Sequence, residues 1–414
     1  MVVDDEEPNP GSGIKMTVQA SLDQGRIPRG VWILGFVSLL MDVSSEMIHS
    51  LLPLFMANSL EASALLIGLV EGIGESVALI VKVFSGVLSD YLGKRKGLAV
   101  LGYTLGALSK PLFAMAPAVS WVLTARVVDR IGKGIRGAPR DALIADLTPH
   151  ALMGAAFGLR QSLDTIGAFM GPLIAVILML LWGNDYRAVF WVAIIPGLFS
   201  AGLLWVGLRE PPHREGMARG NPIRLENLRL LGLAYWATVL LAAVFTLARF
   251  SEAFLVLKAQ QTGIDVALVP LVMVAMNVVY ALSAYPFGKL SDRWSSRWIL
   301  SLGVVILILA DGVLAIADDW RVMMGGMVLW GLHLGITQGV LSALVGRAAP
   351  THLRGTAFGL FNLVSGVSML MASLLAGLVW DRHGSSATFL LGLVFCLISL
   401  FLILLSSRIR QSSK

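Results

Sequence analysis

The sequence predicts an all-α membrane protein with twelve transmembrane helices, arranged as two pseudo-symmetric bundles of six. Hydrophobic residues make up 56% of the 414 residues and charged residues only 14%, a composition far from that of soluble globular proteins. Apolar segments of roughly 20 to 28 residues recur along the chain, each long enough to cross a hydrocarbon core of about 30 Å as a helix. We therefore expect a chain that crosses a lipid bilayer many times.

Each half of the chain contains six of these segments. In the first half they cover residues 31–57, 64–89, 97–118, 120–146, 154–181 and 187–208. In the second half they cover residues 229–258, 265–290, 297–317, 320–347, 354–379 and 385–407. The first segment is longer than the apolar core of a signal peptide and lacks a small-residue cleavage site, so we expect no cleaved leader.

Polar segments mark the ends and the middle of the chain. Residues 1–28 are acidic and contain Pro and Gly, which predicts a disordered cytoplasmic tail. Residues 209–228 combine Pro, Gly and basic residues. They predict a cytoplasmic linker between an N-terminal bundle at 29–208 and a C-terminal bundle at 229–407. Residues 408–414 are expected to form a short cytoplasmic tail.

The distribution of Lys and Arg predicts the orientation in the membrane. If the amino terminus lies inside, the outer loops carry only Arg187, Lys258, Arg321 and Arg382, whereas the inner segments carry most of the other basic residues outside the spans. Cytoplasmic loops of membrane proteins carry an excess of Lys and Arg. We therefore expect both termini in the cytoplasm of a bacterial inner membrane, and the basic charge does not indicate a nucleic-acid partner.

The two halves are repeats of one another. GIRGAPRDALIADLTPHALMGAAFGL at 134–159 aligns with GITQGVLSALVGRAAPTHLRGTAFGL at 335–360. GVLSDYLGKRKGL at 86–98 likewise aligns with GKLSDRWSSRWIL at 288–300. Two six-helix units of the same polarity imply a pseudo-two-fold axis along the membrane normal, with a pathway between the units.

The segment at 86–98 resembles the loop signature of the major facilitator superfamily, a Gly-x-Leu-x-Asp run followed by Gly and basic residues. With MDVSSEM in the first span and DRIGKGIRGAPRD in the fourth, the chain is similar to a bacterial branch of that superfamily that resembles proton-coupled antiporters. The resemblance implies the fold of that superfamily and transport by rocking of two halves. It implies no particular substrate.

The resemblance also implies a conformational latch on the cytoplasmic side. Gly86 permits close approach of two helices, and Asp90 could bind the amino terminus of another helix. In the family this carboxylate and the following basic residues, here Lys94 and Arg95, hold the halves together in the outward-open state. Asp292 is the counterpart in the second half, where the motif is degraded, so its latch should be weaker. The alternative is that the basic residues only determine topology.

Gly167, Gly171 and Pro172 in the fifth span form GAFMGP, which resembles a Gly-x-x-x-Gly-Pro signature associated with antiporters of the superfamily. The glycines permit close packing, and Pro172 removes a backbone hydrogen bond, so we expect a hinge or a seal. A plain packing motif is the alternative, because the glycine pair that follows in the family signature is absent. The resemblance favours export.

Ionisable residues inside the spans are the strongest functional signal, since each costs at least about 2.5 to 3.5 kcal/mol at mid-bilayer unless paired or hydrated. The first half contains Asp42, Glu46, Glu71, Glu75, Lys82, Arg126, Asp129, Arg130, Lys133, Arg136, Arg140, Asp141, Arg160 and Asp164. The balance of signs predicts a paired network, which could be structural. The second half replaces Arg136, Arg140, Asp141, Arg160 and Asp164 by uncharged residues. Some of these charges are therefore expected to serve coupling or substrate binding.

The predicted proton-coupling group centres on the first span. Glu46 and Asp42 lie one helical turn apart, and the repulsion between carboxylates so close favours uptake of a proton. Glu46 is the first candidate and Asp42 the second. Arg130 fits the Arg-x-x-x-Gly pattern of the family, in which the arginine is linked to proton transfer, and Asp129 joins it in the predicted group.

The predicted substrate cavity draws on both halves. Glu252 occupies the position in the seventh span comparable with Glu46, and Arg249 lies three residues before it. These two could instead pair with each other, and His333 in the tenth span could be a hydrogen-bonded packing residue. The full set expected in the cavity is Glu252, Arg249, Arg126, Lys133, Arg136, Arg160, Asp164 and His333.

No enzyme constellation is present in the sequence. It contains no nucleotide-binding Gly-Lys-Ser loop and no His-Glu-x-x-His pair, and its single cysteine, Cys396, excludes an internal disulfide and a cysteine metal cluster. We expect no catalysis, cofactor or metal. The leading prediction is a monomeric secondary transporter that exports a small organic solute in exchange for protons. The alternatives are proton symport or exchange of an anionic metabolite and, less favoured, a membrane sensor that transports nothing.

Overall fold

The structure is a computed structural model that describes residues 27–92, 94–149, 152–210, 230–337, 340–350 and 353–411. Within these ranges the regular elements are all helices. Most of the predicted amino-terminal tail and of the predicted linker lies outside the described residues.

The first half contains the helices of the six predicted spans in order. They are α2 (Arg29–His49) with α3 (Leu52–Ser59), α4 (Ala64–Leu92), α5 (Arg95–Ala114), α6 (Val119–Leu147), α7 (Met153–Leu181) and α8 (Tyr186–Gly207). The α7–α8 turn shows why the chain reverses where it does. Gly183 and Asn184 have φ angles of 60° and 68°, and the Asp185 carboxylate accepts hydrogen bonds from the first amides of α8.

The second half repeats this order. Its helices are α9 (Leu233–Leu247) with α10 (Ala253–Gln261), the short η3 (Val266–Leu268), α11 (Leu271–Arg293), α12 (Ser296–Ala315), α13 (Trp320–Thr337) with α14 (Val340–Ala348), α15 (Arg354–His383) and α16 (Ser385–Gln411). Gly384, with a φ of 85°, separates α15 from α16, since that angle is unfavourable for other residues.

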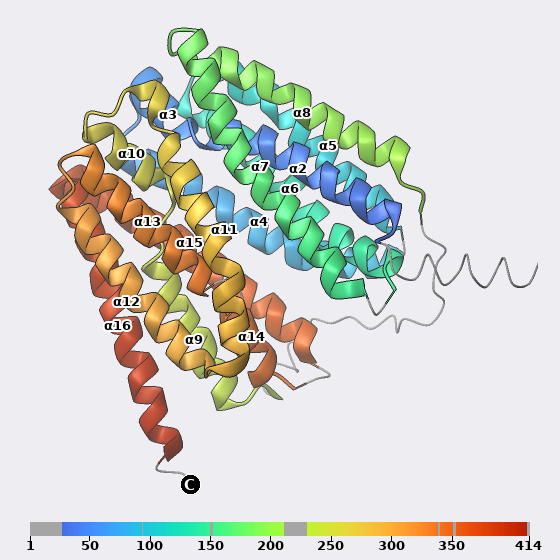
Figure 1. Cartoon of the computed structure of the whole chain (residues 1–414), viewed down its shortest axis with the longest axis vertical. Coiled ribbons are helices and arrows are strands. Elements are labelled where there is room, and N and C mark those ends of the chain that lie inside the picture. Colours follow the sequence, from blue (N-terminus) through green and yellow to red (C-terminus); the bar gives the residue numbers. More distant parts are fainter. Residues whose placement is uncertain are drawn as a thin grey trace, which may run out of the picture.

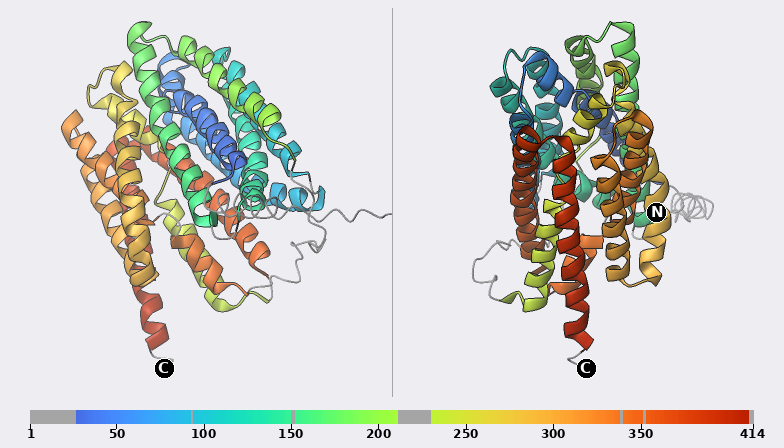
Figure 2. Two further views of the ribbon diagram at one scale, coloured as in Figure 1. Left: turned by 45° about the vertical axis from the view of Figure 1, so that its right-hand side comes forward. Right: turned by 90° about the vertical axis from the view of Figure 1, so that its left-hand side faces the viewer.

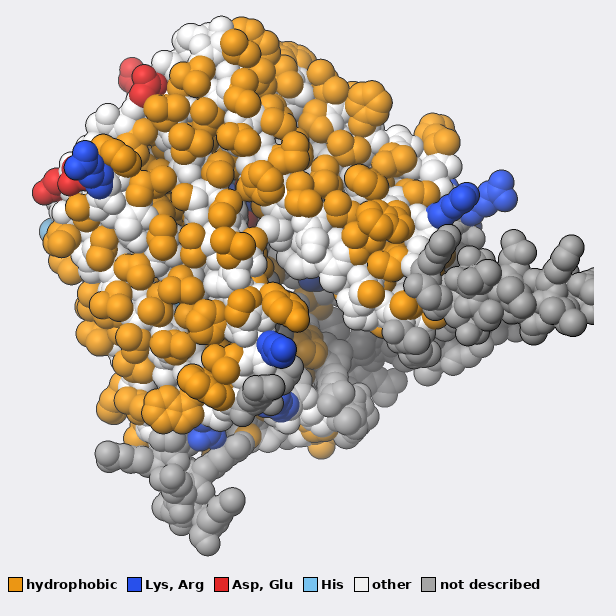
Figure 3. Space-filling model, viewed as in Figure 1, with side chains coloured by type: hydrophobic (Ala, Val, Ile, Leu, Met, Phe, Trp, Pro, Cys, Tyr) orange, Lys and Arg blue, Asp and Glu red, His pale blue; other side chains and the backbone are white. Residues whose placement is uncertain are grey.

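Nine helical segments of the described residues are long and apolar enough to cross a membrane, and they match nine of the twelve predicted spans. The other three predicted spans are also helical, but differ in a way that bears on function. α6 carries too many charges to count as apolar, and the seventh span breaks between α9 and α10. The tenth span is described as α13 and α14, on either side of residues 338–339, which lie outside the described residues. Hydrophobic side chains cover most of the visible face of both bundles, as a lipid-facing surface requires (Figure 3).

The two bundles meet at the end that carries α3 and α10 and diverge toward the other end (Figures 1 and 2). Across this junction the Asp381 carboxylate accepts hydrogen bonds from the amides of Ala64 and Leu65 at the start of α4, at 2.9 and 3.0 Å. Gln260 of α10 donates to Asn58 of α3 at 2.9 Å. These contacts hold the bundles together at one end.

The contact between the bundles continues toward the centre along two helix pairs. Ser76 of α4 donates a hydrogen bond to the carbonyl of Gly366 in α15 at 2.5 Å. Asn277 of α11 donates to the carbonyl of Ala168 in α7 at 3.3 Å. The residues that follow the junction inward form the walls of a central cavity.

Candidate functional site

A cavity of about 270 Å³ lies between the two bundles. Its ionisable lining consists of Glu46, His49, Glu71, Glu75, Arg126, Arg130 and Lys133 from the first half and Arg249 and Glu252 from the second. Its apolar lining includes Phe250, Val256, Met273, Trp330 and Met369, all from the second half. The cavity therefore has one charged wall and one wall that is mainly aromatic and aliphatic.

The charged wall begins with two arginines of α6 that face two glutamates of α4. Arg126 forms an ion pair with Glu71, and the Nη2 atom of Arg130 lies 2.9 Å from Oε1 of Glu75. The spacing of four residues in each helix puts both members on one face, so the two pairs stack one turn apart. Gly74 makes room for this arrangement, because a Cβ atom there would lie 2.9 Å from Cγ of Arg126.

Behind these pairs lies a fully buried lysine that the sequence reasoning missed. The Nζ atom of Lys110 in α5 donates to Oδ1 of Asp129 at 2.7 Å and to Oγ of Ser45 at 3.0 Å. Lys110 is 0% exposed and Asp129 2%, so each charge depends on the other for neutralisation. The sequence feature that could have identified Lys110 is its position as a charged residue inside a predicted transmembrane span.

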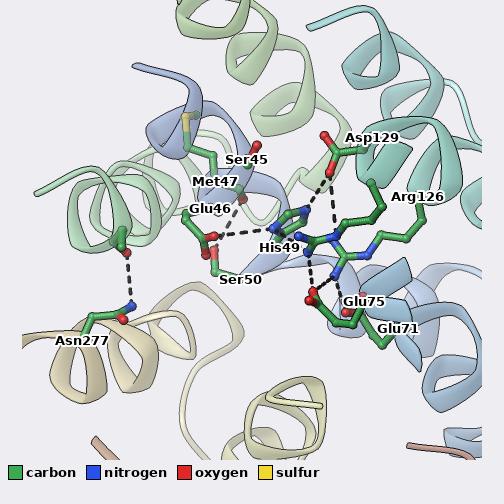
Figure 4. A network of polar contacts seen from close by, with 12 residues as sticks. Ser45, Glu46, Met47, His49, Ser50, Glu71, Glu75, Arg126, Asp129 and Asn277 are labelled. Atoms are coloured by element: carbon green, nitrogen blue, oxygen red, sulfur yellow. Dashed lines mark hydrogen bonds and ion pairs between the residues drawn. The ribbon is translucent and has the colours of Figure 1, made fainter. Parts of the chain in front are cut away.

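His49, also missed from the sequence, lies between Glu46 and Asp129 (Figure 4). Its Nδ1 atom lies 3.6 Å from Oε1 of Glu46, and its Nε2 atom lies 3.6 Å from Oδ2 of Asp129. Arg130 reaches the same ring at 3.5 Å. We call the connected set Glu46, His49, Glu71, Glu75, Lys110, Arg126, Asp129 and Arg130 the central cluster.

The glycines predicted as a hinge are packed against the predicted proton-coupling residues. A Cβ atom at Gly167 would lie 2.9 Å from Cβ of Asp42, and one at Gly171 would lie 2.6 Å from Cβ of Glu46. The glycines thus let α7 approach α2 at the turn that carries both carboxylates. Asp42 is partly buried and is not among the residues that line the cavity.

Four other charges predicted in the first half form a separate group, the α6–α7 cluster, which consists of Arg140, Asp141, Arg160 and Asp164. Arg160 pairs with Asp164 on its own helix and lies 3.6 Å from Asp141, which Arg140 contacts at 3.2 Å. Arg136 lies nearby, with its guanidinium 4.9 Å from the ring centroid of Tyr103. The structure therefore places Arg136, Arg160 and Asp164 apart from the lining of the central cavity.

The seventh span breaks where it reaches the cavity. Arg249, Phe250, Ser251 and Glu252 lie between α9 and α10, outside helical structure. Irregular backbone at membrane depth occurs where it lines a cavity, since its polar groups need partners. Ser251 supplies some of these partners, because its amide donates to Ser373 at 3.3 Å and its hydroxyl accepts from the amide of Ala253 at 3.2 Å.

Three charged residues of the lining have no ion-pair partner within 4.0 Å among the residues that the structure describes: Lys133, Arg249 and Glu252. Arg249 and Glu252 do not pair with each other, and the Arg249 guanidinium lies 5.7 Å from the ring centroid of Phe245. His333 is fully buried outside the cavity lining, and its Nδ1 atom lies 2.8 Å from the carbonyl oxygen of Gly303.

The residues of the predicted latch are only partly described. Arg95 pairs with Asp146 of α6, within the first half, and Lys94 is exposed. A Cβ atom at Gly86 would make an ordinary contact of 3.5 Å with Ala138. The side chains of Asp90 and Asp292 lie outside the described residues, so the latch stays a prediction.

Two helical bundles that cross a membrane many times and enclose a charged cavity define a transporter of small solutes. The model of the Major Facilitator Superfamily matches residues 34–257 and 238–414, and the chain belongs to this family. An uncharacterized MFS-type transporter of Methanocaldococcus jannaschii is 31% identical over 389 residues, which cover 91% of this chain and 95% of that relative.

Two further comparisons extend this result. The multidrug resistance protein MdtH of Photorhabdus laumondii is 28% identical over 192 residues, 46% of each chain. Among solved structures, the nucleoside transporter NupG superposes with a TM-score of 0.74 at 15% identity, over 90% of this chain and 97% of NupG. At that identity the likeness concerns the fold alone.

Proposed function

We propose that this transporter exports a small organic solute in exchange for protons, by alternating access of the central cavity. The observation that carries the proposal is the line of ionisable side chains from Glu46 at the cavity, through His49, to the buried Lys110–Asp129 pair. A membrane protein maintains so many buried charges at high cost, and proton relays are a common use of them.

Glu46 is the proposed site of the coupling proton. With 27% of its side chain exposed, it is far more accessible than Asp129 at 2%, and its ionic contact is a histidine rather than a fixed cation. By contrast, Asp129 is ion-paired with Lys110, and Glu71 is ion-paired with Arg126. A proton on Glu46 weakens its attraction to His49, so proton binding changes the wall that the solute contacts.

The solute is proposed to occupy the space between the charged wall and the apolar wall. Lys133, Arg249 and Glu252 face the cavity without an ion-pair partner among the described residues, so they are available to a polar solute group. Phe250 and Trp330 offer aromatic surface to its apolar part. The antiporter-like GAFMGP motif and the name of the relative MdtH support export as the direction.

Alternating access is proposed to move the bundle 29–208 against the bundle 229–407. With cytoplasmic termini in a bacterial inner membrane, as the basic residues predict, the contacts of Asp381 with α4 close the outer side. The opposite, inner side is where the predicted latch around Asp90 would form in the other state. We propose that one chain is the functional unit, because one chain encloses the cavity.

The second candidate is proton symport or exchange of an anionic metabolite. It is favoured by Lys133 and Arg249, two cations in the cavity without ion-pair partners in the described part of the chain. Antiport and symport predict opposite responses to a pH gradient, so one assay separates them.

The test is flux into proteoliposomes under an imposed pH gradient, with a panel of organic cations, anions and neutral drugs as solutes. Antiport predicts that an acidic lumen accelerates uptake of an external solute, because protons leave as the solute enters. Acceleration by an acidic exterior supports the symport candidate instead. Gradient-independent flux of every transported solute contradicts both proton antiport and proton symport, and leaves only anion exchange of the second candidate. Protein-free liposomes correct for passive accumulation of weak bases and acids.

A further inference from the structure

The core of the second half contains an isolated carboxyl group, that of Asp311 in α12. The residue is 0% exposed. Its Oδ2 atom lies 4.0 Å from Sγ of Cys396 in α16, and its Oδ1 atom is buried without a hydrogen-bond partner among the described residues. A thiol is a weak donor, so the carboxyl group has almost no polar support.

The carboxyl group of Asp311 fits against α16 because residue 392 is a glycine. The same group lies close to the wall of the central cavity. A Cβ atom at Gly392 would lie 2.7 Å from Oδ2 of Asp311 and 3.0 Å from Cε1 of Phe250. The carboxyl group and the ring therefore flank the same point of α16. Phe250 lines the central cavity, so its ring separates the carboxyl group from the cavity.

The internal repeat shows which residue occupies the position equivalent to Asp311 in the first half. The offset that aligns Gly134 with Gly335 also aligns Lys110 with Asp311 and Asp129 with Trp330. The helices agree with this offset, since α5 and α12 both have 20 residues. In the first half the two positions hold a buried ion pair. In the second half the position equivalent to Asp129 holds Trp330, which carries no charge.

The ionisable group that contacts Asp311 among the described residues is Cys396 of α16. Beyond this thiol, Arg249 of the α9–α10 break lies within electrostatic range of Cys396 and of His333 in α13. Among the described residues no cation pairs directly with Asp311. An ionised carboxylate in such surroundings is very costly, and the group avoids the cost by holding a proton.

We propose that Asp311 is a proton-binding site of the second half, separated from the central cavity by the ring of Phe250. Release breaks the O–H bond, leaves the electron pair on the carboxylate and passes the proton to water that enters from the cavity. The new negative charge then attracts Arg249, whose buried Nε atom has no hydrogen-bond partner in the described chain. Arg249 thereby leaves the solute cavity when the proton leaves Asp311.

The proton site can be tested without a solute. Infrared spectra of the protein in liposomes at neutral pH should contain a protonated-carboxyl band that Asp311→Asn removes and Cys396→Ser shifts, since a hydroxyl donates to the carboxyl group more strongly than a thiol. Asp146→Asn, which removes an acid paired with Arg95, should leave the band intact. A band that is unchanged in both the Asp311 and the Cys396 variants would overturn the proposal. If the Asp311 variant does not fold, the presence or absence of a band shift in the Cys396 variant decides whether the proposal stands.

The coupling step rests on the proposed function, and it has a separate test. In the flux assay with an imposed pH gradient, Asp311→Asn should retain solute exchange between equal pH values but lose stimulation by the gradient. Full stimulation in a variant that has lost the infrared band contradicts the coupling step and leaves the proton site in place. Absence of gradient stimulation in the unmodified protein contradicts the proposed function, again independently of the band.

Discussion

Lys110 of α5 and Asp311 of α12 occupy the same position of the internal repeat, and they meet opposite surroundings. Lys110 lies 2.7 Å from Asp129 and is held by Ser45 as well. Asp311 has only the thiol of Cys396 at 4.0 Å among its described polar neighbours. The same contrast extends to the cavity, where Arg126 and Arg130 are paired with glutamates but Arg249 and Glu252 are not.

The comparison separates two uses of charge in one fold. In the first half, Lys110, Arg126 and Arg130 are each paired with a carboxylate, so removal of one partner leaves the other charge buried and uncompensated. In the second half, Asp311, Arg249 and Glu252 have no ion-pair partner among the described residues, so they can respond to a proton or to a solute. We therefore expect substitutions of the paired buried charges to affect folding most, and substitutions of Glu46 and of the unpaired charges of the second half to affect coupling.

Loss of Lys110 should have the largest effect on stability. Lys110→Met leaves Asp129 buried without its cation, which should lower the free energy of unfolding by about 3 to 5 kcal/mol. Thermal unfolding of the purified protein in detergent would measure this. The double variant Lys110→Met/Asp129→Leu should recover most of the loss, because neither charge remains. Equal losses in the single and double variants would show that the pair is not a unit.

A methyl group at the α2–α7 contact should have the next largest effect. Gly171→Ala puts a Cβ atom 2.6 Å from Cβ of Glu46 and 2.9 Å from the carbonyl oxygen of Val43, so the helices must separate, at a cost of about 1 to 3 kcal/mol. The repeat tolerates Ala372 at the equivalent position. Gly158→Ala in the same helix meets nothing within 4 Å and serves as the control. A Gly171→Ala variant as stable as the control would contradict this reading of the contact.

The smallest effect on stability is expected at Asp311. A protonated Asp and an Asn are alike in shape and charge, so Asp311→Asn should change the free energy of unfolding by less than about 1 kcal/mol. The matched substitution Asp129→Asn in the first half should cost far more, because it strands Lys110. Similar losses in the two variants would remove the contrast between the halves.

Much of the architecture could be predicted from the sequence, because hydropathy and repetition are properties of single segments. Even the seventh span, which the structure divides, lies at the predicted position. The resemblance of the 86–98 segment to the superfamily signature agrees with the family match.

Pairing between helices could not be predicted in the same way. Glu71, Glu75 and Lys82 share a helical face, but the structure pairs the glutamates with Arg126 and Arg130 of another helix. Which residues pair depends on the rotation of α4 and α6 about their axes. Close contacts between the two helices, such as the one at Gly74, determine this rotation. By contrast, the Arg160–Asp164 pair has both members four residues apart on one helix, so its spacing was visible in the sequence.

The central claim, that Glu46 carries the coupling proton, is tested most directly by Glu46→Gln in proteoliposomes. The variant should retain solute exchange between equal pH values, because Gln keeps the shape of the protonated acid, but should lose stimulation by a pH gradient. Glu61→Gln, which removes an exposed carboxylate between α3 and α4, should behave like the unmodified protein. Full gradient-driven flux in Glu46→Gln would contradict the claim.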